Sequence, residues 1–254
     1  MFDPLESPFL TLFLSLCTFW GAALIGSWFR KRMHNFNAEN HDDFIFVLGG
    51  ALTLLGLIMG FTFSMAVSRY DQRKNYEEQE ANAIATAYIR ADLLPLADAA
   101  KVRNLLKSYL HQRIYNYNLR DRRQLRQSGA ETTLLQTEMW SAVAAPAAAQ
   151  PSVLTLLTVA GMNDVLSAQG YTQAAWWNRI PRAAWALVAA ISIFCNLMIG
   201  YIAQGRSGFV RLILPIVLSI SLFLIADIDS PRGGGVIHVP PQNLENLAEF
   251  LGSQ

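Results

Sequence analysis

The sequence contains few charged residues, and those it has are unevenly distributed. Asp, Glu, Lys and Arg make up 15% of the chain, whereas hydrophobic residues make up 52%. In soluble domains about a quarter of the residues are charged. Almost all of the charge here lies within residues 30–43, 69–138 and 204–249. The net charge is only +1 and no basic face stands apart from its acidic neighbours, so nucleic acid is not an expected partner.

Residues that commonly serve catalysis or metal binding are also scarce. The four histidines are His34, His41, His111 and His238. They lie in separate segments and lack the spacing of metal ligands. Cys17 and Cys195 both lie in apolar runs, where cysteine acts as a small apolar residue. No glycine-rich loop carries a lysine in the position that phosphate binding needs. The sequence therefore predicts no enzyme, no cofactor and no metal site.

The chain does contain four long apolar runs. Residues 8–29, 44–67 and 183–203 include no Asp, Glu, Lys or Arg. Because about 20 apolar helical residues cross the hydrocarbon core of a bilayer, each run is predicted to be a transmembrane helix. The fourth run, residues 209–226, is shorter and contains Arg211, which lies near one end and can snorkel to the membrane surface. Four spans place both termini and the central region on one side, and the Lys and Arg counts do not say which side.

The region between the second and third runs is also predicted to be helical. No Gly or Pro occurs from Arg69 to Leu94, so the second membrane helix is expected to continue into the aqueous phase and to stop at Pro95. Apolar periodicity then predicts a helix over residues 98–126, with Asp98 as its N-cap. Gly129 is expected to end that helix. Further helices are expected over residues 131–143, 152–168 and 242–251, with a Pro146-containing linker at 144–151.

The predicted fold class is thus all-α, a polytopic membrane protein with four transmembrane helices and a helical extramembrane region between helices 2 and 3. The expected organisation is a first helix pair (1–68), a helical extramembrane region (69–181), a second helix pair (182–227) and a C-terminal segment (228–254).

The second apolar run is rich in small residues. Gly56 and Gly60 form a small-xxx-small pair of the kind that lets membrane helices approach closely. One interpretation is helix packing alone. The other is a pore-lining helix, in which bulky apolar side chains form a constriction and hydroxyls add polar lining. The residues that this second interpretation places at the pore are Ile58, Phe61, Thr62, Ser64 and Ser68.

Acidic residues follow this run and also the fourth run. Around an oligomer axis, Asp71, Glu77, Glu78 and Glu80 would each become a ring of charge. Glu80 begins a stretch of small residues, so we expect it to be buried and paired. Asp227 and Asp229 are expected to cap local turns, and binding a cation or pairing with Arg232 are the alternatives.

Several motifs together resemble the bacterial bestrophin-like family over about residues 44–240. The motifs are Gly60-Phe61 with Ser64, Tyr70-Asp71 with Arg73, Glu80-Ala81-Asn82-Ala83-Ile84, Tyr88, Asp92-Leu93-Leu94-Pro95, Tyr109 with Arg113, and Asp229-Ser230-Pro231 followed by Gly233 to Gly235. Arg232 departs from the family pattern, in which an aromatic residue often follows the proline.

The name of the family links it to bestrophins, which are pentameric anion channels whose second membrane helix lines the pore. The resemblance thus implies a homo-oligomer, with five subunits favoured, in a bacterial inner membrane, with the central region and the termini in the cytoplasm. We assign Glu80, Asn82 and Arg113 to a structural polar network, with Asp71 as a further candidate for ring charge. The partners expected are the lipid bilayer, further copies of the chain and small inorganic ions.

Two other functions remain open from the sequence. A cation channel would use the acidic residues beyond the second span as rings that attract cations. A non-conducting scaffold or signalling protein would use the central helices as a docking surface. The anion channel is preferred because of the resemblance.

Overall fold

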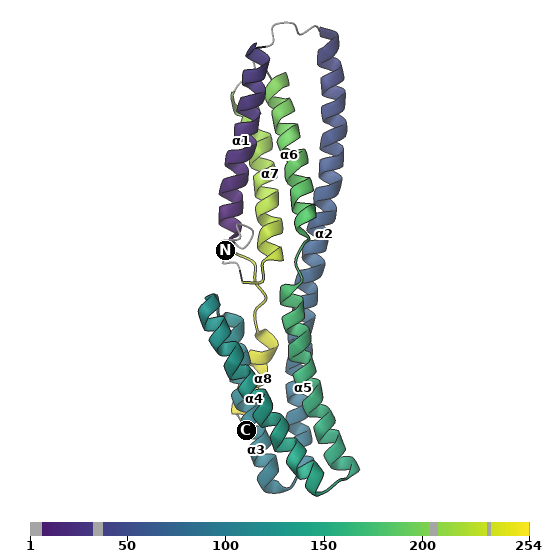
Figure 1. Cartoon of the computed structure of the whole chain (residues 1–254), viewed down its shortest axis with the longest axis vertical. Helices are drawn as coiled ribbons and strands as arrows, with labels where there is room; N and C mark the ends of the chain where they lie inside the picture. The colour runs from purple at the N-terminus through teal and green to yellow at the C-terminus, as the bar shows by residue number, and fades with distance from the viewer. Residues whose placement is uncertain (1–6, 33–37, 204–207, 233–234, 254) are drawn as a thin grey trace. The chain divides into compact units, whose positions relative to one another are not determined.

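The structure is a computed structural model and describes residues 7–32, 38–203, 208–232 and 235–253, with side chains described except at 38–41, 122, 208 and 210. Within these ranges all regular structure is helical (Figure 1). The elements are α1 (Pro8–Arg32), α2 (Ala38–Arg90), the 3-10 helix η2 (Ala91–Leu93), α3 (Leu96–Asn118), α4 (Arg122–Ala149), α5 (Val153–Trp177), α6 (Arg182–Ile202), α7 (Gly208–Asp229) and α8 (Gln242–Gly252).

Four helical stretches of the described chain are long and apolar enough to cross a membrane. They contain the four apolar runs, so the predicted fold class is confirmed. The second run lies in α2, a single helix of 53 residues that continues through Arg69 to Arg90. The expected extension beyond the membrane span is therefore present. It ends in η2 just before Pro95, because the residue before a proline disfavours helical backbone.

The boundaries of the next two helices differ from those predicted. Pro95, not Asp98, is the N-cap of α3, because α3 begins one turn earlier than expected. The helix ends at Asn118, since Leu119 is extended and Asp121 caps the next helix by accepting a hydrogen bond from the Arg123 N–H at 2.9 Å. The expected helix over 98–126 is thus two helices joined by a short turn.

Helix α4 also passes through two expected breaks. Gly129 lies in its second turn and does not end a helix. Pro146 lies in its last turn, where the proline removes one backbone hydrogen bond but its own carbonyl still accepts from Gln150 N–H at 2.9 Å. The linker expected at 144–151 is therefore mostly helical. Ser152 caps α5 in a capping box with Thr155, and α5 then extends to Trp177, well beyond the expected end at 168.

The chain divides into two compact units, and the boundary falls within α2. Residues 1–70 and 179–238 form the first, which we call the membrane unit, and residues 71–178 and 239–254 form the second, the aqueous unit. Both helix pairs lie in the membrane unit, whereas the C-terminal segment is shared between the two units.

The membrane unit is held together by close helix packing and an apolar core. Helix α1 packs against α6 and α7, and Phe19, Leu55 and Val188 are among the buried core residues. Gly26 and Gly200 allow the tightest approach. A Cβ on Gly200 would lie 1.9 Å from the Ala23 carbonyl oxygen, and one on Gly26 would lie 2.0 Å from that of Leu197. This crossing of α1 and α6 therefore needs glycine on both sides.

In the aqueous unit, α3 packs against α4 and α8, and α4 packs against α5. Its core is apolar, with Ile84, Val102, Leu106, Met139 and Val165 essentially inaccessible to solvent. A few polar side chains share this interior, and they form the network described below.

Candidate functional site

Helix α2 has one face that packs inside the membrane unit. Leu55 and Ala66 belong to the buried core, and Thr62 between them is only 4% exposed. The Thr62 hydroxyl donates to the Ile58 carbonyl at 2.8 Å, a bond within the helix itself. Because residues seven and four apart share a helix face, these side chains define the inward side of α2.

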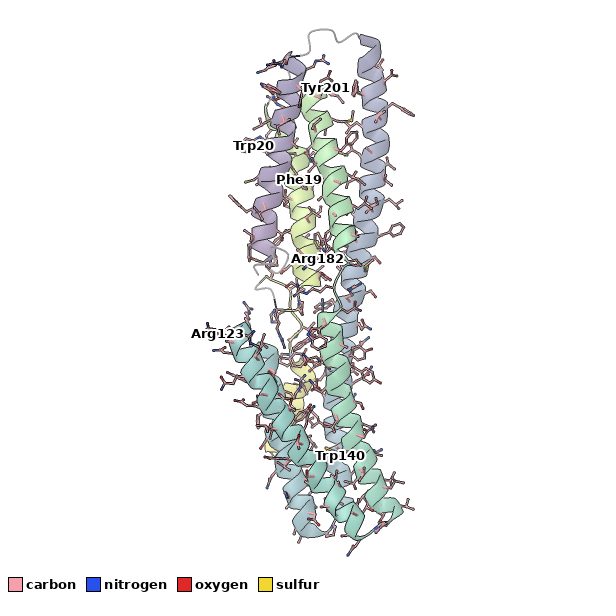
Figure 2. The ribbon with its side chains drawn as sticks, in the orientation of Figure 1. Phe19, Trp20, Arg123, Trp140, Arg182 and Tyr201 are labelled. Carbon is pink, nitrogen blue, oxygen red and sulfur yellow. The ribbon has the colours of Figure 1, made fainter. Side chains whose placement is uncertain are left out.

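The opposite side of α2 is open within the single chain. Leu54, Leu57 and Phe61 are large apolar side chains that are all about half exposed or more, and Phe61 is 65% exposed. Ser64 and Ser68 continue the same face and are also exposed. Figure 2 shows side chains projecting from α2 away from α6. In a membrane helix this face meets either lipid or another subunit.

The glycines of α2 lie on this open side and have no neighbours. A Cβ built on Gly49, Gly50, Gly56 or Gly60 would meet no atom within 4 Å. Gly26 and Gly200 differ, because the close helix packing inside the subunit leaves no room for a Cβ at either position. The glycines of α2 thus leave a shallow strip of bare backbone that no helix of the same chain fills.

The structure separates the five residues that the sequence suggests for a pore. Phe61, Ser64 and Ser68 share the open face. Ile58 is half-buried against the core, and Thr62 faces inward with its hydroxyl bonded to its own helix. Three of the five can therefore face a neighbouring copy directly, and Thr62 has a packing role within the subunit.

A buried ion pair lies in the aqueous unit. Glu80 of α2 is fully buried and Arg113 of α3 is nearly so. The Arg113 Nε donates to Glu80 Oε1, and its Nη2 donates to Glu80 Oε2 at 3.2 Å. Thr172 of α5 donates its hydroxyl to the same carboxylate at 3.1 Å. One carboxylate thus connects three helices, and the fork of the guanidinium satisfies both of its oxygens.

Burial and the charges of this pair together shift the pKa of Arg113 and of the neighbouring tyrosines. Burial alone would lower the pKa of Arg113, but the nearby Glu80 carboxylate more than offsets this and raises it. Burial, followed by the negative charge of Glu80, raises the pKa of Tyr109 and Tyr117. The tyrosines therefore stay neutral, and Tyr117 packs edge-on against Trp176 with ring centroids 4.8 Å apart. The arrangement is that of a structural network rather than an acid–base site.

A second buried carboxylate, Glu77, holds the C-terminal helix. It accepts hydrogen bonds from the Asn243 N–H at 2.9 Å, the Leu244 N–H at 3.0 Å and the Asn243 amide group at 2.6 Å. The N-cap of α8 is Pro241, which provides no side-chain cap. Glu77 therefore caps α8 from α2 and complements the positive end of the helix dipole. Burial raises the pKa of Glu77, and the three hydrogen bonds partly oppose this rise.

The two other polar residues suggested on α2 lie elsewhere. Asp71 and Asn82 are both exposed. The exposed position of Asn82 puts it on a different side of α2 from Glu80, so the structure does not bring it to the Glu80–Arg113 pair. Asp71 takes no part in the hydrogen bonds and the ion pair described above for Glu77 and Glu80.

Asp227 and Asp229 lie where α7 ends, and both are buried. The Asp227 carboxylate accepts hydrogen bonds from the Val236 and Ile237 N–H groups, each at 3.0 Å. Gly235 permits this approach, because a Cβ there would collide with the Asp227 carboxylate. Asp229 accepts a hydrogen bond from the Ile180 N–H, two residues before α6 begins. Both carboxylates thus accept hydrogen bonds from backbone amides.

No group of three or more potential metal-ligating side chains occurs among the residues that the structure describes. Catalytic and cofactor sites were not expected from the sequence.

Two parts of these networks were not predictable from sequence. Thr172 is 92 positions from Glu80, and Asn243 is 166 positions from Glu77. Neither residue carries a local motif that would indicate its partner. The only available signal was the run of small residues around Glu80, which predicted burial without identifying what would pair with the carboxylate.

Fold and site define a class of protein: a helical membrane protein in which two helix pairs flank an aqueous helical bundle, with one membrane helix extending into that bundle. The model of the bestrophin-like domain matches residues 17–244, and the chain therefore belongs to the bestrophin-like family.

Solved structures share this fold. The chain is similar to a bacterial bestrophin homologue from Klebsiella pneumoniae, with 14% sequence identity, a TM-score of 0.66, and coverage of 96% of this chain and 97% of the other. A variant of that homologue gives 13% identity, a TM-score of 0.67, and coverage of 97% and 96%. No curated protein matches the chain. At these identities the likeness concerns the fold.

Proposed function

We propose that this protein is a homo-oligomeric ion channel in which copies of α2 surround the pore and anions pass more readily than cations. The observation that carries the proposal is the open face of α2. Phe61, Ser64 and Ser68 lie on that face, and its glycine strip has no partner within the subunit. Family membership supports the proposal, since bestrophins conduct ions through a pore lined by the second membrane helix.

The chemistry of this face suits a gated pore. Exposed Phe61 side chains from several copies would form an apolar ring, which can close a pore by excluding water. Ser64 and Ser68 would line the next turns toward the aqueous unit with hydroxyls, and Ile58 would border the ring. The span carries no charged residue, so permeating ions meet no fixed opposite charge within the membrane.

The alternative of a cation channel depends on acidic rings near the end of the α2 span. Glu77 is occupied by the amides of α8 and Glu80 by Arg113, which leaves Asp71 and Glu78 as the exposed carboxylates there. This lowers the negative charge available to attract cations and favours anions.

From the family membership we also propose that the protein lies in the bacterial inner membrane with its aqueous unit in the cytoplasm.

Planar-bilayer recording of the purified oligomer in an asymmetric KCl gradient tests the proposal. A reversal potential near the chloride equilibrium value is expected. A value near that of potassium would instead support the cation channel. Reproducible absence of current from an intact oligomer would support a scaffold or signalling role and contradict any channel.

A matched pair of variants tests the pore face. Phe61→Ala removes the proposed apolar ring, so we expect single-channel conductance or open probability to rise several-fold. Phe13→Ala removes a phenyl side chain of nearly equal exposure on α1, where Phe13 is 64% exposed and Phe61 on α2 is 65% exposed. That control is expected to conduct like the wild type. Equal effects of the two substitutions would contradict the assignment of Phe61 to the pore.

A further inference from the structure

The turn between α3 and α4 is strongly basic. Its sequence runs Arg120-Asp121-Arg122-Arg123, and Arg126 follows within the first turns of α4. We call residues 120–126 the basic turn. The side chains of Arg120, Arg123 and Arg126 are exposed, and Figure 2 shows Arg123 at the end of α4.

The nearby acidic side chains form their hydrogen bonds with groups other than the guanidinium groups of these arginines. The Asp121 carboxylate accepts the Arg123 backbone N–H, and Glu131 accepts hydrogen bonds from Gln112 and Gln127. The ion pairs described for the aqueous unit join Arg90 to Asp164, Arg103 to Asp92 and Arg113 to Glu80. Among described side chains, Arg120, Arg123 and Arg126 enter none of these pairs.

The positive charges of these arginines do not stabilise α4 itself. The first turn of α4 has no acidic residue, and positive side chains at a helix N-terminus oppose the helix dipole. Replacing these arginines should therefore leave the helix at least as stable. A role outside the subunit explains their presence better than a role within it.

Contacts inside the aqueous unit show at which of its ends the basic turn lies. Glu80 of α2 pairs with Arg113 of α3, and Asp92 pairs with Arg103, so the two helices run antiparallel. Nine residues before Glu80 the chain reaches Asp71, and nine residues after Arg113 it reaches the start of α4. The α2 step covers about 14 Å, and the helical part of the α3 step, from Arg113 to Asn118, covers about 8 Å. Tyr117 also contacts Trp176, just before α5 ends. The basic turn therefore lies at the end where α2 and α5 connect to the membrane spans.

We infer that the basic turn binds the phosphate groups of anionic lipids at the membrane surface. Arginine matches phosphate geometry with paired donors. Basic segments close to a membrane are attracted to anionic lipid, and the attraction extends over about 8 Å at physiological salt. The side chains of Arg120, Arg123 and Arg126 are all exposed, and this suits an extended charged surface better than a pocket for a single free phosphate.

Hydrogen–deuterium exchange of the full-length protein in nanodiscs tests the inference. One set of discs contains phosphatidylcholine alone, and the other an equal mixture with phosphatidylglycerol. We expect exchange of the amides of residues 119–126 to slow several-fold in the mixed discs. Equal rates in both sets of discs would overturn the inference.

Two variants with equal loss of charge make the test specific. Arg123→Gln/Arg126→Gln should abolish the slowing. Lys101→Gln/Lys107→Gln removes two positive charges from α3 away from the turn, so the slowing should remain. Loss of the effect in both variants would show a general charge effect and overturn the assignment to this turn.

Two further arms use the wild-type protein and need no variant to fold. Inorganic phosphate added to the phosphatidylcholine discs should leave the exchange rates unchanged. If phosphate slows exchange as much as phosphatidylglycerol does, the turn is a site for free anions, and the lipid inference fails. Raising the KCl concentration should reverse the slowing in mixed discs through screening. Slowing that persists in high salt would exclude electrostatic binding of headgroups.

Discussion

At the residue scale, the stability of the aqueous unit depends on two buried carboxylates with different partners. Glu80 is neutralised by the guanidinium of Arg113, while Glu77 is surrounded by neutral amide donors from α8. Removing one partner of a buried pair leaves an uncompensated charge, which costs more free energy than the intact pair contributes. The two sites should therefore respond differently to mutation and to pH.

Arg113→Met should lower the free energy of unfolding by about 3–5 kcal/mol, because it leaves the Glu80 carboxylate buried without its cation. Thermal or denaturant unfolding of the purified protein in detergent measures the loss. Asp92→Asn is the control, since it breaks the partly exposed Arg103–Asp92 pair and should cost about 1 kcal/mol or less. The double variant Glu80→Met/Arg113→Met should recover part of the loss. Similar losses for Arg113→Met and Asp92→Asn would contradict the importance of the buried pair.

Glu77 predicts a dependence of stability on pH. Because burial raises its pKa in the folded protein, the folded state holds this proton more tightly than the unfolded chain does. The stabilisation from this protonation is complete below the usual pKa of 4.5 and is lost as pH rises through the raised pKa. The stability of the wild type minus that of Glu77→Gln should thus fall as pH rises above 4.5.

Melting temperatures of the two proteins between about pH 4 and pH 7 check this trend. Glu78→Gln controls for loss of one negative charge at an exposed position of the same helix. A stability difference that stays constant or increases with pH for Glu77→Gln would show that the hydrogen bonds from α8 outweigh the effect of burial.

At the element scale, glycines in the membrane unit have opposite roles. Gly200 lies where α6 touches the backbone of α1, whereas Gly21 on α1 has no atom within 4 Å of a built Cβ. Gly200→Ala should therefore separate the helices and lower stability by about 1–3 kcal/mol. Gly21→Ala should be neutral or slightly stabilising, because alanine favours helix. Thermal unfolding in detergent measures both, and equal effects would argue against a tight α1–α6 crossing.

The sequence predicted the positions of some helices accurately and those of others poorly. Long apolar runs predicted the four membrane spans, and the absence of Gly and Pro from Arg69 to Leu94 predicted the extension of α2. The break between α3 and α4 was missed, because periodic apolar residues continue through it and only Asp121 marks the cap. Gly129 and Pro146 were given too much weight, since packing of α4 on α3 and α5 outweighs their local preferences. The partners of Glu77 and Glu80 come from distant segments, so only the fold identifies them.

At the scale of the whole molecule, the open face of α2 predicts self-association. Glycine strips allow helices to approach closely, and the strip that includes Gly56 and Gly60 has no partner within one subunit. Light scattering of the detergent-solubilised protein should give a mass that is a multiple of 28.3 kDa, with five copies favoured by the family resemblance. A monomer under conditions that support ion conduction would contradict the proposed pore.

A substitution on the glycine strip tests the same proposal, and a substitution on α1 is its control. Gly60→Val should weaken the oligomer by filling the bare backbone, whereas Gly21→Val on α1 adds the same side chain at an equally open position outside α2. The oligomer should survive the second change and dissociate more readily with the first, as measured by the same light-scattering experiment across a dilution series.

The aqueous unit is assembled from residues 71–178 and 239–254, and this has a consequence for synthesis. The Glu77 carboxylate leaves the ribosome long before Asn243 and Leu244, which provide its hydrogen-bond donors. Folding of this unit must therefore finish after all four spans have been translated. A message cut short after the fourth span would still encode every membrane helix but would leave Glu77 without the amides that satisfy it. The aqueous unit can therefore complete its folding only after the chain has been translated through residue 244, within the last helix.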